Sequence, residues 1–186
     1  MNEVIKTILE RRSVRKYEDK PVSREDLELI VKCGRYAATG MGKQPWHFTV
    51  VTQRAVLDKL SNANAAIMLA DPNTPPFVRE QMENGTFDTY RGAPCAVLVS
   101  GADCASMTVA DCANAVENMA LAAKSLGLDS CYLASFQVCL NAPNGGPLKA
   151  ELGIPEGYTP HFALAIGYGA EQPVAAPRKE DAVNWV

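Results

Sequence analysis

The chain opens with two segments whose apolar residues recur at helical spacing. A first helix is predicted over residues 2–12, with charged residues on one face and four apolar residues on the other: Val4, Ile5, Ile8 and Leu9. A second helix is predicted to begin at Ser23, which follows Pro21, and to end near residues 39–40. Its predicted buried face consists of Leu27, Ile30, Val31 and Ala38. Two amphipathic helices therefore precede the first strand.

Short apolar and β-branched runs predict four strands farther along the chain, at residues 48–52, 95–99, 131–134 and 162–166. A further helix is predicted over 54–69. The segment 105–126 is apolar nearly all round, which indicates a central buried helix capped by Gly127. Residues 71–91 are rich in proline, asparagine and glycine, so loops around one short helix are expected there. Loop segments of this kind often cover binding sites.

The order of these elements indicates an α+β fold. Two helices precede any strand and no regular alternation follows, which favours helices packed on a mixed sheet. No internal repeat or linker divides the chain, so residues 1–186 are expected to form a single domain. The tail, residues 171–186, has few apolar residues before Val183 and Trp185. It is expected to lie along another surface, such as that of a partner subunit.

Composition narrows the class of protein. Hydrophobic residues make up 47% of the chain and charged residues 21%, which disfavours disordered and fibrous classes. The first residues mix acidic and basic side chains, unlike an export signal. No apolar run approaches the ~18 residues of a membrane span. A cytoplasmic location without membrane association is therefore expected.

Charge and cysteine content exclude further classes. The net charge of -3 argues against nucleic-acid binding, and six cysteines without an export signal are expected to be reduced thiols. No CxxC pair is present and the only histidines are His47 and His161, so no metal site is expected. Both histidines lie in or beside predicted strands and are assigned structural roles. No Ser-His-Asp, Cys-His or paired-carboxylate arrangement indicates a catalytic side chain.

Two segments carry candidate binding chemistry. Residues 11–17, RRSVRKY, gather four cations and a serine where the first helix gives way to a loop. Arginine presents paired donors to phosphate, which makes an anionic ligand attractive, although a solvated basic patch is the alternative. Residues 37–46, AATGMGKQPW, join a helix to a strand through small residues that let the backbone approach a flat ligand. Alone, this second segment is equally compatible with a packing turn.

Together these segments give the sequence its resemblance to the nitroreductase family. The family opens with a helix ending in an RRSVR-like cluster and continues with a small-residue loop ending in QPW. Further matches are RGAP at 91–94, NMALAA at 118–123, LGL at 126–128, GY at 167–168 and PR at 177–178. The resemblance spans essentially the whole chain. It implies a nitroreductase-like fold with flavin mononucleotide (FMN) as cofactor, and a homodimer with FMN at the subunit interface and the C-terminal segment over the partner.

The resemblance also implies individual cofactor-binding residues. Phosphate and ribityl contacts are expected from Arg11, Arg12, Ser13, Arg15 and Arg178. The partner subunit's loop is expected to border the flavin ring through Ala38, Thr39, Gly40 and Gly42. Backbone amides near the flavin N5 are expected from Leu133, Ala134 and Ser135. Many relatives have asparagine at the Gly42 position, and well-known members have Glu-Gly in place of Ala134-Ser135.

The function implied is an oxidoreductase. NADH or NADPH would reduce the flavin, leave, and be replaced by a nitroaromatic, a quinone or a similar small acceptor, in a ping-pong mechanism. The alternative is a flavin-binding storage or sensing protein with little turnover, which NADH would not bleach rapidly. A third interpretation, a nucleic-acid binder using residues 11–16, conflicts with the acidic net charge.

Overall fold

A computed structural model describes residues 1–186 and has an α+β architecture built around one sheet. The strands are β1 (Trp46–Val51), β2 (Cys95–Ala102), β3 (Asp129–Leu133) and β4 (Tyr158–Gly167), in the order β1-β2-β4-β3. The expected α+β class is confirmed. The sheet within the chain is antiparallel rather than mixed, because its three strand pairs are all antiparallel. One isolated bridge, Ser13 to Ser130, is parallel.

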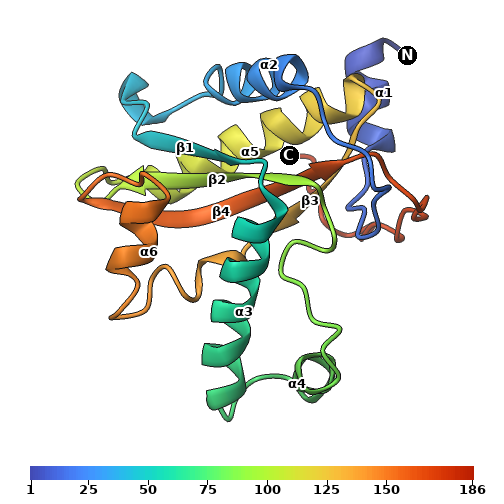
Figure 1. The fold of residues 1–186 in the computed structure, drawn as a ribbon. Coiled ribbons are helices and arrows are strands. Elements are labelled where there is room, and N and C mark those ends of the chain that lie inside the picture. Colours follow the sequence, from blue (N-terminus) through green and yellow to red (C-terminus); the bar gives the residue numbers. More distant parts are fainter.

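Helices cover both faces of the sheet (Figure 1). On one side lie α2 (Arg24–Gly34) and α5 (Thr108–Ser125), with α1 (Glu3–Glu10) beside α5. On the other lie α3 (Arg54–Ala70), α4 (Pro76–Glu83) and α6 (Gly146–Glu151). Two short 3-10 turns complete the elements: η1 (Gly40–Gly42) and η2 (Ser135–Gln137). The sequence reading had not predicted α6 or these two turns.

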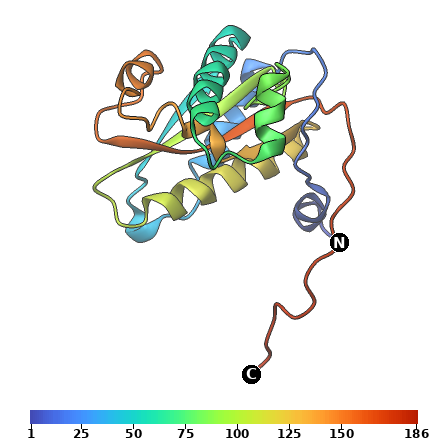
Figure 2. The same cartoon turned by 90° about the horizontal axis from the view of Figure 1, so that it is seen from below.

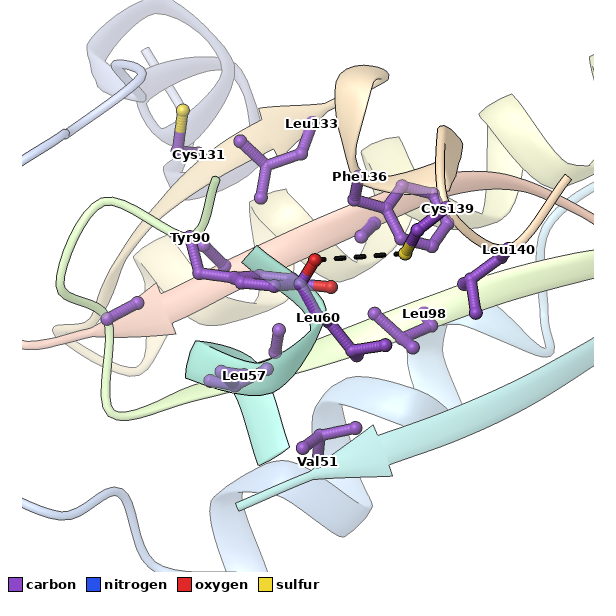
Figure 3. Packing of buried hydrophobic residues seen from close by; sticks show 14 of the residues in the cluster. Val51, Leu57, Leu60, Tyr90, Leu98, Cys131, Leu133, Phe136, Cys139 and Leu140 are labelled. Carbon is purple, nitrogen blue, oxygen red and sulfur yellow. Dashed lines mark hydrogen bonds between the residues drawn. The ribbon is translucent and has the colours of Figure 1, made fainter. Parts of the chain in front are cut away.

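The strand β2 contributes to two hydrophobic clusters, one on each face. Its residues Ala96 and Leu98 belong to the cluster under α3, whereas Val97 and Val99 belong to the cluster under α5. Because successive side chains of a strand point to opposite faces, a strand covered on both sides is apolar throughout. Figure 3 shows the first cluster, where residues of α3 meet Tyr90 and Phe136.

Most predicted boundaries agree with the structure. The Ser23 side chain caps α2 by accepting a hydrogen bond from Asp26 N at 3.0 Å, and Gly127 ends α5 at a φ of 77°. The predicted end of the second helix is wrong. The helix ends at Gly34, and Ala38 is exposed rather than buried. Residues 35–37 bond back to the last turn of α2, and the chain then bonds to α5, as described below.

Two helices present apolar surface that nothing in the chain covers. None of the α1 residues is buried, although four apolar residues line one face, with exposures between 47% and 66%. The α5 helix buries one face only, so the expected all-round burial is not reached within the single chain. The tail after Ala170 runs away from the body (Figure 2), and Trp185 is 95% exposed. None of the helices is both long and apolar enough to cross a membrane.

Candidate functional site

The basic segment after α1 is fixed against the edge strand β3. Val14, 1% exposed, anchors it, and Val14 N donates a hydrogen bond to Ser130 O at 3.0 Å. The Tyr17 hydroxyl donates to Val14 O at 2.7 Å, and Ala170 N donates to Lys16 O at 2.9 Å. The segment is thus held between β3 and the start of the tail, with Ser13 in the bridge to Ser130.

The arginines of this segment have few acidic partners. Arg11 Nε lies 3.6 Å from Glu117 Oε1, whereas Arg12 donates to the carbonyls of Leu9 and Arg11, each at 2.7 Å. Arg15 Nη1 donates to Ser13 O at 3.3 Å. Glu171 accepts from the backbone N of Arg15, at 2.6 Å, and not from its guanidinium. Most of the positive charge is therefore available to an external anion.

A further arginine joins the group from a different element. Burial raises the pKa of the Cys131 thiol, and the charges of Arg15, Arg91 and Arg11 oppose that rise. These three guanidinium groups therefore lie around the same residue of β3. Arg91 belongs to the RGAP motif at 91–94, which by itself does not indicate a place in the site. Local sequence cannot predict that Arg91 lies near β3, because this proximity depends on the tertiary structure.

The outer edge of β3 leads from the basic segment to the predicted amide-donating residues. Leu133 ends the strand and is buried, while Ala134 and Ser135 are exposed where η2 begins. Three residues separate Ser130 from Leu133, about 10 Å along a strand. Because β3 is an edge strand, its outer backbone groups beyond Ser130 are unpaired within the sheet. An elongated ligand can lie along this edge.

The turn after β3 is supported from beneath by Asn64, a fully buried residue of α3. Its side-chain amide donates to Phe136 O at 3.0 Å, and its carbonyl accepts from Cys139 N at 2.7 Å. Both ends of the side chain are therefore used by the protein. The sequence analysis missed this residue, because nothing in the local pattern of α3 distinguishes it from a core position.

The small-residue loop is fixed to the first turns of α5. Gly40 N donates to the buried Asp111 carboxylate at 3.0 Å, and Asn114 Nδ2 donates to Ala38 O at 3.2 Å. Gly42 has a φ of 67°, a left-handed conformation that suits glycine. Thr39 Oγ1 accepts from Gln44 N at 3.3 Å. These bonds hold the loop backbone on α5 after α2 has ended.

Strand register separates this loop from the basic segment. The loop leads into Trp46, which pairs with Gly101, whereas Ser13 bridges Ser130 at the level of Cys95. Six residues of β2 separate the two levels, about 20 Å along the strand. The side chains lie closer than these backbone levels, because Arg11 pairs with Glu117 of α5 while the loop bonds to Asp111 and Asn114 of the same helix. Arg178 is exposed and donates only to Ala176 O within the tail.

A large groove lies elsewhere, between α2 and the outer edge of β1. It has a volume of about 1370 Å³ and is bordered by Leu27, Val31, Thr39, Val50 and Thr52. It contains none of the residues of the basic segment, so the charged site and the groove are separate features. The groove meets the end of β1, an edge strand, at Val50 and Thr52.

The histidines are not arranged for acid–base catalysis. His47 packs edge-on to Tyr158, with ring centroids 6.1 Å apart. His161 Nε2 is buried without a hydrogen-bond partner, and burial lowers the pKa of this histidine. No cluster of three or more His, Cys, Asp or Glu side chains is placed to hold a metal ion.

Known proteins resemble this chain in sequence and in fold. The sequence model described as "Nitroreductase family" matches residues 8–168. A crystal structure of a nitroreductase with bound FMN from Bacteroides fragilis is 34% identical, covers 100% of both chains and superposes with a TM-score of 0.90. A candidate NADH dehydrogenase/NAD(P)H nitroreductase of Archaeoglobus fulgidus is 32% identical over 92% of this chain and 88% of its own. An FMN reductase (NADPH) of Bacillus subtilis is 28% identical over 96% and 70%.

Proposed function

The chain belongs to the nitroreductase family, and from that premise we propose that it is an FMN-dependent oxidoreductase that passes electrons from NADH or NADPH to nitroaromatics, quinones or a similar small acceptor. The observation that carries the proposal is the basic segment fixed beside an unpaired strand edge. The FMN reductase and the FMN-bound nitroreductase among its relatives support the same cofactor.

The donor set fits the phosphate of FMN. A phosphate monoester carries about -1.5 to -2 charges and offers several acceptor oxygens. Arg11, Arg15 and Ser13 supply charged and hydroxyl donors at one place, and only Arg11 has a carboxylate near its guanidinium. The Arg12 guanidinium already donates to two backbone carbonyls. It would therefore attract the phosphate by its charge more than by direct hydrogen bonds.

The remainder of FMN would lie along β3. The amides of residues 133–135 would face the ring, with the turn fixed from below by Asn64. When bound, FMN supplies the redox chemistry, accepting electrons from the nicotinamide and delivering them to the acceptor. The protein's own contribution is to bind, to orient and to leave one side of the ring accessible.

A second copy of the chain would complete the site. As the family resemblance implies, the loop 38–42 would border the flavin ring bound by the partner subunit. The groove between α2 and β1 would receive the partner's tail, whose residues after Pro173 are exposed in the single chain. Arg178 on that tail would become a further phosphate ligand.

Donor and acceptor would use the same side of the ring in turn. Both must come within a few ångströms of the reacting atom. The small residues Thr39, Gly40 and Gly42 would leave space for one of them at a time. Ping-pong kinetics follow from this alternation.

One experiment tests cofactor and donor together. The purified protein should show a flavin spectrum with about one FMN per chain, and anaerobic NADH or NADPH should bleach it rapidly. A protein that is colourless and does not bind added FMN would contradict the proposal. Bound flavin that neither nucleotide reduces would instead favour a storage or sensing role.

A further inference from the structure

Arg91 stands out because its backbone conformation is costly for a side chain. Its φ is 60°, in the left-handed region that non-glycine residues seldom adopt, and the neighbouring Gly92 has a φ of 75°. Residues held in such conformations are often found at binding sites, because the surrounding structure must maintain them. Arg91 is one of only three non-glycine residues with positive φ; the others, Met41 and Gln44, belong to the loop before β1.

The turn that contains Arg91 is held rigidly from both sides. Asp88 accepts hydrogen bonds from Tyr90 N at 2.8 Å and Gly92 N at 2.6 Å. Arg54 of α3 pairs with Asp88 at 2.6 Å and donates to Ala93 O at 3.0 Å. These hydrogen bonds hold the backbone around Arg91 in the left-handed conformation, although the residue is not a glycine.

The same bracing leaves the Arg91 guanidinium without an acidic partner. The nearest carboxylate along the chain, Asp88, is already bound by Arg54 and by two backbone amides. The Arg91 Nε is buried and has no hydrogen-bond partner at all. A buried donor on a charged group is expensive to leave unsatisfied, which indicates that a ligand completes it.

The fold places this unpartnered group at the phosphate end of the proposed site. Arg91 lies four residues before Cys95, which pairs with Ile166, and Ile166 pairs in turn with Ser130. Ser130 bridges Ser13 of the basic segment. Cys131, the next residue of β3, is influenced by the charges of Arg11, Arg15 and Arg91. Cys131 lies in the same cluster as Tyr90, the neighbour of Arg91 (Figure 3).

We infer that Arg91 is a further FMN-binding residue, whose guanidinium completes the phosphate site of Arg11, Ser13 and Arg15 from the β2 side. This inference rests on the proposed function. Arg91 would act by charge-assisted hydrogen bonds to phosphate oxygens, and the turn held by Arg54 and Asp88 would fix its orientation before the ligand arrives.

The test compares FMN with riboflavin, which lacks the phosphate, by fluorescence titration of the FMN-depleted protein. Arg91→Gly is the informative variant, because glycine adopts the observed φ without strain and removes the guanidinium. We expect the Kd for FMN to rise about tenfold or more, as for loss of a charged hydrogen bond, and the Kd for riboflavin to stay within about twofold, since it has no charged group to lose. Arg91→Lys should give an intermediate loss, because the charge remains without the planar donor set.

The control is Lys59→Ala, which also removes one positive charge but lies on α3 in an exposed pair with Glu151 at 2.6 Å. It should leave both Kd values unchanged. Thermal unfolding of the FMN-free proteins should show Arg91→Gly at least as stable as the parent, because strain is relieved. That result would exclude misfolding as the cause of weaker binding.

Three outcomes separate the interpretations. Unchanged FMN affinity in Arg91→Gly, with loss in Arg11→Ala, would overturn the role of Arg91 and leave the proposed function intact. Equal weakening of FMN and riboflavin would overturn the phosphate assignment. Failure of the parent protein to bind FMN would reject the proposed function itself.

Discussion

The arginines of the basic segment, which lies beside the start of β3, differ in the hydrogen bonds and ion pairs that their side chains already make. Arg12 is bound to two backbone carbonyls, whereas the guanidinium of Arg15 has a single backbone contact at 3.3 Å. Arg11 has a weak pairing with the half-exposed Glu117, at 3.6 Å. Surface pairs of this kind contribute little stability. Arg11 and Arg15 are therefore the residues most free to turn toward a phosphate.

Replacing Arg11 or Arg15 by alanine should weaken FMN binding and leave the fold intact. The expected loss is about 1.5–3 kcal/mol for each, or about tenfold to over a hundredfold in Kd, because each change removes hydrogen bonds to a charged group. Fluorescence titration with FMN measures it. Unchanged affinity in both variants would favour the solvated-patch interpretation of the basic segment.

The lowered pKa of His161 predicts a loss of stability in mild acid. Burial favours the neutral ring in the folded state, while the unfolded chain binds a proton near the ordinary pKa of about 6.5. The unfolded state therefore takes up more protons as the pH falls through that value, and stability declines. The stability that depends on a neutral His161 is fully present above the pH that equals its ordinary pKa.

Urea unfolding at pH 7.5 and 5.5 should show this decline in the parent protein. The change should be smaller in His161→Phe, which keeps an aromatic ring and cannot titrate. An equal pH dependence in the two proteins would assign the acid sensitivity to other groups.

At the scale of elements, polar side chains fix segments that carry the site. Asn64 joins α3 to η2, and Asp111 and Asn114 join α5 to the small-residue loop. In each case a side chain binds backbone groups that no regular element satisfies. The conformations of η2 and of the small-residue loop are therefore fixed by hydrogen bonds to the helices α3 and α5.

Replacing Asn64 by alanine should destabilise the protein by about 2–4 kcal/mol. The change leaves Phe136 O and Cys139 N without partners in the core, each at a cost of about 1–3 kcal/mol. Chemical denaturation measures the difference. Asn62→Ala, on the exposed side of the same helix, should change stability by less than about 0.5 kcal/mol. Similar effects of the two changes would contradict the bracing role.

At the scale of the whole molecule, uncovered apolar surface supports a dimer. The apolar face of α1 and one side of α5 lack a covering layer, and every residue of the tail after Pro173 is exposed. A twofold assembly would cover the surface and complete two identical sites at once.

Sedimentation at micromolar concentration should therefore show a dimer with two FMN. Deleting residues 171–186 should weaken both dimerisation and FMN binding, because the deletion removes Arg178 and the segment expected in the partner's groove. A flavin-loaded monomer would contradict the assignment of the loop 38–42 to the partner's site.

Steady-state kinetics should give parallel double-reciprocal plots when NADH or NADPH is varied at several fixed concentrations of a nitroaromatic or quinone. Parallel lines follow if the two substrates occupy one space in turn. His47→Ala and His161→Ala should cause only modest loss of flavin reduction. Intersecting lines would indicate a ternary complex, and a collapse of reduction in a folded histidine variant would show that a side chain carries an essential step.

The sequence by itself determined the elements whose causes are local. Residue spacing, helix capping and the conformational freedom of glycine act within a few residues. They account for the Ser23 cap of α2, for α3, for the apolar strand β2 and for the end of α5 at Gly127. The family followed from motifs that are also short, at residues 11–17 and 37–46.

Only the tertiary structure decided where α2 ends, what supports the turn after β3 and which helix holds the small-residue loop. The bond from Gly40 to Asp111 spans 71 residues and that from Arg15 to Glu171 spans 156. The position of Arg91 beside Cys131 likewise depends on strand register. Local sequence cannot encode such contacts, because each depends on how the whole chain packs once its elements have formed.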